Sequence, residues 1–217
     1  MANIFPKWSN LVPAKIVASA ILLVAAITIG VTYYFTPKTT RVGYQPQQPV
    51  DFRHDFHVGQ LGLDCRFCHN HVDESAHANI PSSSTCMSCH QVIKPESKAL
   101  EPIRESFESG KPVAWVKIHE VPDYVYFSHT AHVNRGVSCV ECHGEIDKME
   151  QVYHAKPLSM RFCLDCHRSP EDVLRPQSEV YNLDWKPESI EAHKNMGAKF
   201  KEDWKVNPPT SCFGCHR

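Results

Sequence analysis

Apolar positions are concentrated near the start of the chain, where residues 16–35 form a run of twenty residues without a charged side chain. A helix of that length rises about 30 Å, the thickness of a bilayer hydrocarbon core. Trp8 precedes the run, Tyr33 and Tyr34 lie near its end, and basic residues flank both sides, as in membrane anchors. We therefore predict an uncleaved transmembrane helix over residues 16–35, because the apolar core of a cleaved signal peptide is usually shorter.

The remaining hydrophobic positions predict few long elements. Residues 36–50 contain three prolines and no helical period, which predicts an extended linker. Residues 97–110 predict a helix that ends at Gly110, and residues 189–204 predict an amphipathic helix. We expect little regular sheet, so the predicted fold class is mostly α-helical and irregular, with one N-terminal transmembrane helix and a loop-rich domain over residues 51–217.

Composition adds an unusual content of cysteine and histidine. The chain has 217 residues and a net charge of −1, which gives no indication of nucleic-acid binding, but it contains ten cysteines and fourteen histidines. Every cysteine belongs to a C-x-x-C-H motif. The five motifs are Cys65–Cys68–His69, Cys86–Cys89–His90, Cys139–Cys142–His143, Cys163–Cys166–His167 and Cys212–Cys215–His216.

This spacing is typical of covalently attached haem c. Two cysteines three positions apart reach the two vinyl groups at a porphyrin edge, and the next residue presents its imidazole to the iron. Zinc sites do not require a histidine directly after the second cysteine, and disulfides confined to C-x-x-C pairs would provide no long-range cross-link. We therefore predict five haem c groups, around which the loop-rich domain wraps.

Haem attachment also predicts the orientation in the membrane, which the flanking cations leave open because each side carries two. Bacteria attach haem c outside the cytoplasm. We therefore expect residues 1–15 to be cytoplasmic, the helix to cross the bacterial inner membrane once, and the haem domain to lie on the periplasmic or outer face.

The haem domain contains an internal repeat. Phe52-x-His54-x-x-His57 precedes the first motif, and Phe127-x-His129-x-x-His132 precedes the third. Residues 52–90 and 127–167 are therefore predicted to be duplicated two-haem units, and residues 168–217 form a segment for the fifth haem.

The histidines outside the motifs are candidates for the second axial position of each iron. The i, i+3 spacing of each H-x-x-H pair suits two different haems better than one iron. The predicted distal ligands are His54, His57, His129 and His132, with His119 preferred as the fifth. The alternatives are His77, His154, His193 and Met160.

Longer stretches resemble a known family. The anchor followed by VGYQPQQPVDFRHDFHVGQLGLDCRFCH, then WVKIHEVPDYVYFSHTAHVNRGVSCVECHG, and LSMRFCLDCHR resemble the membrane-anchored pentahaem subunit of alternative complex III, among multihaem cytochromes of the class III type. The resemblance implies bis-histidine ligation, which fits the five predicted distal histidines. It also implies a quinol-oxidising integral membrane subunit, an iron–sulfur subunit and other cytochrome c subunits as partners.

The expected function is electron transfer, because an iron with two imidazole ligands has no position left for a substrate. The chain would carry electrons from a quinol-oxidising complex to a periplasmic cytochrome, a copper protein or a terminal oxidase, and would not be catalytic alone. The first alternative is a self-sufficient anchored quinol dehydrogenase. The second is a catalytic multihaem reductase, which needs an iron with an open face, whereas all five motifs end in histidine.

Overall fold

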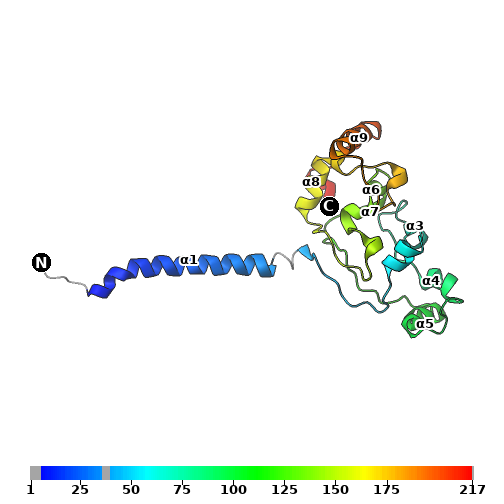
Figure 1. Ribbon diagram of the computed structural model, residues 1–217, viewed down its shortest axis with the longest axis horizontal. Helices are drawn as coiled ribbons and strands as arrows, with labels where there is room; N and C mark the ends of the chain where they lie inside the picture. The colour runs from blue at the N-terminus through cyan, green and yellow to red at the C-terminus, as the bar shows by residue number, and fades with distance from the viewer. Residues whose placement is uncertain (1–5, 36–39, 217) are drawn as a thin grey trace. The chain divides into compact units, whose positions relative to one another are not determined.

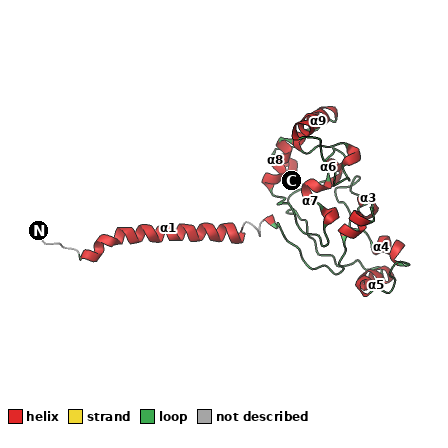
Figure 2. Ribbon diagram, viewed as in Figure 1, coloured by secondary structure: helices red, strands yellow, loops and turns green. Residues whose placement is uncertain are grey.

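The computed structural model describes residues 6–35 and 40–216. The chain divides into two compact units, Met1–Arg41 and Val42–Arg217, which are described separately below. Figures 1 and 2 show a long N-terminal helix in the first unit and short helices joined by loops in the second.

Residues 7–35 of the first unit form a continuous helical segment. A 3₁₀ turn at Lys7–Leu11 leads into helix α1 at Val12–Gly30, which ends in a π-turn at Val31–Phe35. The helix predicted over residues 16–35 is therefore present, and it begins earlier than predicted. Among the described residues, one helix, Lys7–Tyr34, is long and apolar enough to cross a membrane.

The second unit is built from short helical elements. Over residues 40–216 it has no β-strand, and its only β pairing consists of isolated bridges between Val125 and His216 and between Val137 and Leu174. This confirms the expectation of little regular sheet. The elements are η3 (Asp55–Gln60), α3 (Cys65–Cys68), α4 (Ser83–His90), η4 (Lys98–Leu100), α5 (Glu101–Ser109), α6 (His129–Val133), α7 (Cys139–His143), η5 (Ile146–Lys148), α8 (Met160–Arg168), η6 (Pro170–Asp172), η7 (Gln177–Glu179), α9 (Ile190–Asp203) and α10 (Cys212–Cys215).

Both longer helices predicted from the pattern are present. Helix α5 ends at Gly110, whose φ of 70° is the left-handed conformation that glycine adopts without strain. Helix α9 begins after Ser189, whose side chain accepts a hydrogen bond from the backbone N–H of Ala192 at 3.0 Å. These helix boundaries were predictable because the glycine and the serine that specify them adjoin the helices in the sequence.

The hydrophobic core of the second unit is small. One cluster joins Val50, Met87 and Ile103, and another joins Val72, Val133 and Val180. Because so few aliphatic side chains are buried, the polypeptide alone encloses little apolar surface.

The C-terminal half of the predicted linker packs against the second unit. The backbone N–H of Gly43 donates to the carbonyl of His154 at 2.8 Å, and that of His154 donates to Tyr44 at 3.0 Å. The side chain of Gln48 bonds to both backbone groups of Val116 at 2.9 Å. Residues 43–50 thus lie outside any helix or strand and are held to the domain. Residues 36–39 of the predicted linker lie outside the described residues.

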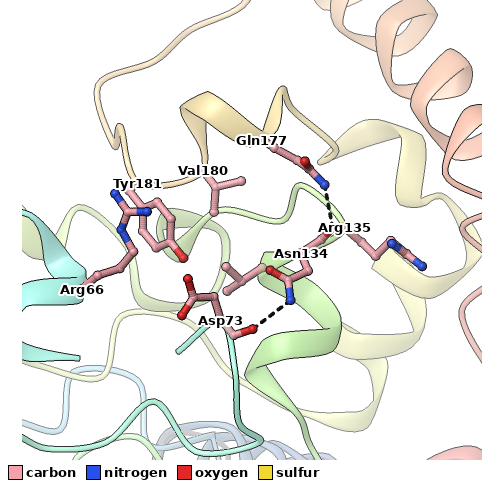
Figure 3. A pocket seen from close by; sticks show the side chains of 8 residues that line it. Arg66, Asp73, Asn134, Arg135, Gln177, Val180 and Tyr181 are labelled. Atoms are coloured by element: carbon pink, nitrogen blue, oxygen red, sulfur yellow. Dashed lines mark hydrogen bonds between the residues drawn. The ribbon is translucent and has the colours of Figure 1, made fainter. Parts of the chain in front are cut away.

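The two predicted repeat units are in direct contact. The side chains of Thr130 and Asn134 donate to the carbonyl of Asp73 at 2.7 and 2.8 Å, and the N–H of His129 donates to Ala76. Residues 174–182 cover this junction, where Val180 lies with Gln177 near Asn134 (Figure 3).

Candidate functional site

The motif cysteines lie on helical turns. In α3, α7 and α10 the first cysteine is also the first helical residue, and the residue before it is extended. All ten cysteines are free thiols, so the disulfide alternative does not apply. Each C-x-x-C pair is therefore available for two thioether bonds.

Burial is the dominant influence on the two thiols of the third motif. It is the main reason that the pKa of Cys139 is raised to about 11 and that of Cys142 to about 12. A raised pKa keeps the free thiol neutral in these apolar surroundings. The described part of the chain also has no group of three or more side chains arranged to hold a metal ion by themselves.

The attachment sites form a row whose order differs from the sequence. Besides burial, the electrostatic influence of a cysteine from a neighbouring motif raises the pKa of one thiol at each junction. These neighbouring pairs are Cys86 with Cys68, Cys65 with Cys139, Cys166 with Cys142, and Cys215 with Cys163. The spatial order is therefore second, first, third, fourth and fifth motif.

Three predicted distal histidines face the histidine of a motif at a separation that suits haem. Two imidazoles on opposite sides of one metal, each with its nitrogen about 2.0 Å away, have ring centroids roughly 6 Å apart. The observed centroid distances are 6.3 Å for His57–His90, 6.3 Å for His129–His143 and 6.0 Å for His132–His167. His129 and His132, three residues apart in the chain, thus lie beside the histidines of two different motifs.

Backbone carbonyls orient most of these imidazoles. Nδ1 of His57, His129 and His132 donates to the carbonyls of Arg53, Ala76 and Ser128 at 2.8, 2.9 and 2.7 Å. Nδ1 of the motif histidines His69, His90 and His167 does the same to Asn79, Ile93 and Pro209 at 2.6, 2.9 and 2.7 Å. Because Nδ1 carries the proton, Nε2 is left with its lone pair for a metal.

The first motif has His54 in its vicinity. The pKa of His54 is lowered to about 4, mainly by burial and next by the nearby His69 and His57. A neutral imidazole is the form that ligates iron. The structure therefore brings His54 close to His69, and the role of His54 as a distal ligand stays a prediction.

His119 lies beside the histidine of the third motif and not beside that of the fifth. Its ring is 4.3 Å from His143 and stacks 5.2 Å from His154, whereas the ring beside His216 belongs to Tyr124, at 5.5 Å. A centroid distance of 4.3 Å is shorter than two axial ligands of one iron require. His119 as the fifth distal ligand stays a prediction, to which the sequence assigns no particular iron.

The other alternative ligands have different surroundings. Nε2 of His193 hydrogen-bonds to the carbonyl of Leu174 at 2.9 Å, and its ring packs on Trp185, so this histidine has a packing role. His77 is exposed, and Met160 is 70% exposed at the start of α8. The structure thus gives none of these three an inward-facing position beside a motif histidine.

The phenylalanine of each F-x-H-x-x-H unit has a role that sequence reasoning missed. Phe52 stacks on His57 at 4.4 Å and meets His54 edge-on at 4.8 Å. Phe127 does the same with its two histidines, at 4.6 and 4.8 Å. One aromatic ring therefore holds both imidazoles of a pair in diverging orientations. The sequence did contain a signal for this role, since a phenylalanine stands at the same position in both F-x-H-x-x-H units.

A separate cavity of about 360 Å³ lies where residues 174–182 cover the repeat junction (Figure 3). Its lining includes Arg66, which stacks over Tyr181 at 4.5 Å, together with Asp73 and Gln177. Charged and amide groups of this kind do not suit the apolar face of a porphyrin. This cavity is not a haem site.

The C-x-x-C-H motifs, the paired imidazoles and the small aliphatic core define a multihaem cytochrome c. The chain belongs to the family described as cytochrome c7 and related cytochrome c, whose profile matches residues 50–102 and 125–217. It is also similar to the protein named menaquinone reductase, multiheme cytochrome c subunit, of Nitratidesulfovibrio vulgaris Hildenborough. The two are 29% identical over 185 residues, which cover 80% of this chain and 78% of that protein.

Proposed function

We propose that this chain is a membrane-anchored electron-transfer subunit that carries five haem c groups and exchanges electrons with the quinone pool through a separate membrane subunit. The observation that carries this proposal is the spacing of 6.0 to 6.3 Å in three pairs of facing imidazoles. Side chains at this separation would close both faces of an iron, which suits electron transfer and would leave no position there for a substrate.

The chain's own residues would hold and orient the cofactor. The ten cysteines would form the thioethers, and the motif histidines would be the proximal ligands. The proposed distal ligands are His54, His57, His129, His132 and His119. Haem c supplies an iron that gains and loses one electron. Phe52, Phe127 and the carbonyl acceptors of Nδ1 fix the imidazoles, so little would rearrange when the charge changes.

The link to quinone rests on the relative, whose name describes a menaquinone reductase subunit, and on the resemblance to alternative complex III. We propose the alternative complex III arrangement, in which a quinol-oxidising membrane subunit and an iron–sulfur subunit deliver electrons. Other cytochromes, a copper protein or a terminal oxidase would receive them on the periplasmic side of the inner membrane. The relative's name favours one second candidate, the reverse flow of electrons toward menaquinone.

Charge supports a basic soluble partner. Residues 1–41 contain four of the 23 lysines and arginines and none of the acidic residues, so the domain from Val42 has 19 basic and 24 acidic side chains. Ionised haem propionates would make this domain more negative. A positively charged electron carrier would therefore be attracted to it.

The proposal is tested by offering a menaquinol analogue to the detergent-solubilised subunit, alone and in its assembled complex, and following the reduced haem α-band. We expect reduction only in the complex. Rapid reduction of the isolated chain would instead make it a quinol dehydrogenase in its own right. Adding menaquinone to the pre-reduced complex provides the matched test of direction, because rapid haem oxidation there would favour the quinone-reducing candidate.

A further inference from the structure

A largely buried ion pair lies inside the third attachment motif. Nη2 of Arg175 is 2.7 Å from Oε1 of Glu141, which stands between Cys139 and Cys142 in α7. The side chain of Arg175 is 5% exposed and that of Glu141 is 31% exposed. Bulk water therefore screens this pair less than the exposed pairs of the domain surface.

The position of Arg175 is fixed by several contacts. The backbone N–H of Arg175 donates to the carbonyl of Gly136 at 3.0 Å. In the side chain, Nη1 donates to the carbonyl of Asn182 at 3.3 Å, and the guanidinium lies over the ring of Trp185, 5.0 Å from its centroid. Gly136 has φ +78°, and a Cβ there would come within 2.5 Å of the carbonyl oxygen of Arg175. The positive charge of Arg175 is thus fixed in position by backbone contacts as well as by Glu141.

The charges of this pair reach the sulfurs of two adjacent motifs. Burial is the main reason for the raised pKa of Cys142 and Cys166, and the negative charge of Glu141 raises both further. The pKa of Cys139 is likewise raised mainly by burial, and Arg175 opposes that rise. In the row of attachment sites, the pair therefore stands beside the third and fourth sites.

We propose that Arg175 and Glu141 set the reduction potential of the haem attached at Cys139–Cys142. When a ferric haem accepts one electron from a redox mediator and becomes ferrous, its site gains one negative charge. A fixed cation nearby stabilises the reduced form and a fixed carboxylate stabilises the oxidised form, more strongly where water is excluded. Since the third site lies between the first and the fourth, its potential affects transfer along the whole row.

The inference requires haem at this motif but does not depend on the quinone link or on the direction of electron flow. A failure of either proposal is therefore distinguishable from a failure of the other. Arg175 and Glu141 are positioning residues, because they would act on the potential without touching iron.

The test is a spectroelectrochemical titration of the full-length holoprotein with Glu141→Gln, Arg175→Gln and Arg175→Lys, with haem content measured for each. Glu141→Gln leaves the guanidinium uncompensated, so we expect one of the midpoint potentials to rise. Arg175→Gln leaves the carboxylate uncompensated, so the same potential should fall. Arg175→Lys keeps the charge and should stay near the wild type.

Glu171→Gln is the matched control. Glu171 is 30% exposed and pairs with Lys201 at 2.8 Å, much as Glu141 pairs with Arg175, but Glu171 lies outside any motif. Shifts of the same sign in both Gln variants of the pair, or shifts no larger than that of Glu171→Gln, would overturn the proposal. If Arg175→Gln fails to incorporate haem, Glu141→Gln is compared with Arg175→Lys instead. The proposal then requires that Glu141→Gln raises a midpoint potential and that Arg175→Lys does not.

Discussion

Removal of one distal imidazole should open one iron and leave the others closed. His132 lies 6.0 Å from His167, its Nδ1 donates to Ser128 at 2.7 Å, and Phe127 stacks on its ring. In His132→Ala no side chain replaces the imidazole. One iron in five should become high-spin in the ferric state, and the reduced protein should bind one additional carbon monoxide per chain, relative to the wild type.

The assay is electron paramagnetic resonance of the oxidised protein together with carbon monoxide titration of the reduced protein. His193→Ala is the matched control, since His193 is also partly buried but its Nε2 bonds to the carbonyl of Leu174 at 2.9 Å. It should add no high-spin iron. The reasoning is refuted if His132→Ala gives no increase, or if both variants give the same one.

The remaining predictions concern stability and partner binding. The haem-free chain should lack native helix in the domain by circular dichroism, because few aliphatic side chains are buried; a native-like spectrum would count against this. Leu174→Ala removes a side chain that is 0% exposed, and should destabilise the holoprotein by about 2–5 kcal/mol in thermal or denaturant unfolding. Phe127→Ala should give a partial high-spin signal, smaller than that of His132→Ala, since the imidazole stays but loses its stacking partner. Reduction of a basic electron carrier should slow severalfold between about 0.05 and 0.5 M salt, whereas an unchanged rate would contradict electrostatic attraction.

Local signals in the sequence predicted much of the architecture. Helix α5 ends at Gly110 and α9 begins after Ser189, where a glycine and a capping serine specify the boundary from neighbouring residues alone. The five C-x-x-C-H motifs could also be recognised from the sequence alone, because such a unit needs only one helical turn to present its three side chains.

Features that depend on distant parts of the chain were not predictable in this way. The pair of Arg175 with Glu141 joins residues 34 positions apart, and the row of motifs runs in an order that spacing along the chain does not encode. His119 was preferred as the fifth distal ligand because it precedes the second repeat, and only long-range folding brings it beside His143 and His154. Gly43 and Tyr44 looked like linker residues, and their hydrogen bonds to His154 depend on tertiary structure.

The most direct test of a five-haem electron carrier is a coulometric reductive titration of the purified full-length protein, combined with haem content per polypeptide. The account predicts five haems and five electrons per chain, because every one of the five motifs supplies two cysteines and a histidine. Four or fewer haems or electrons per fully matured chain would contradict it.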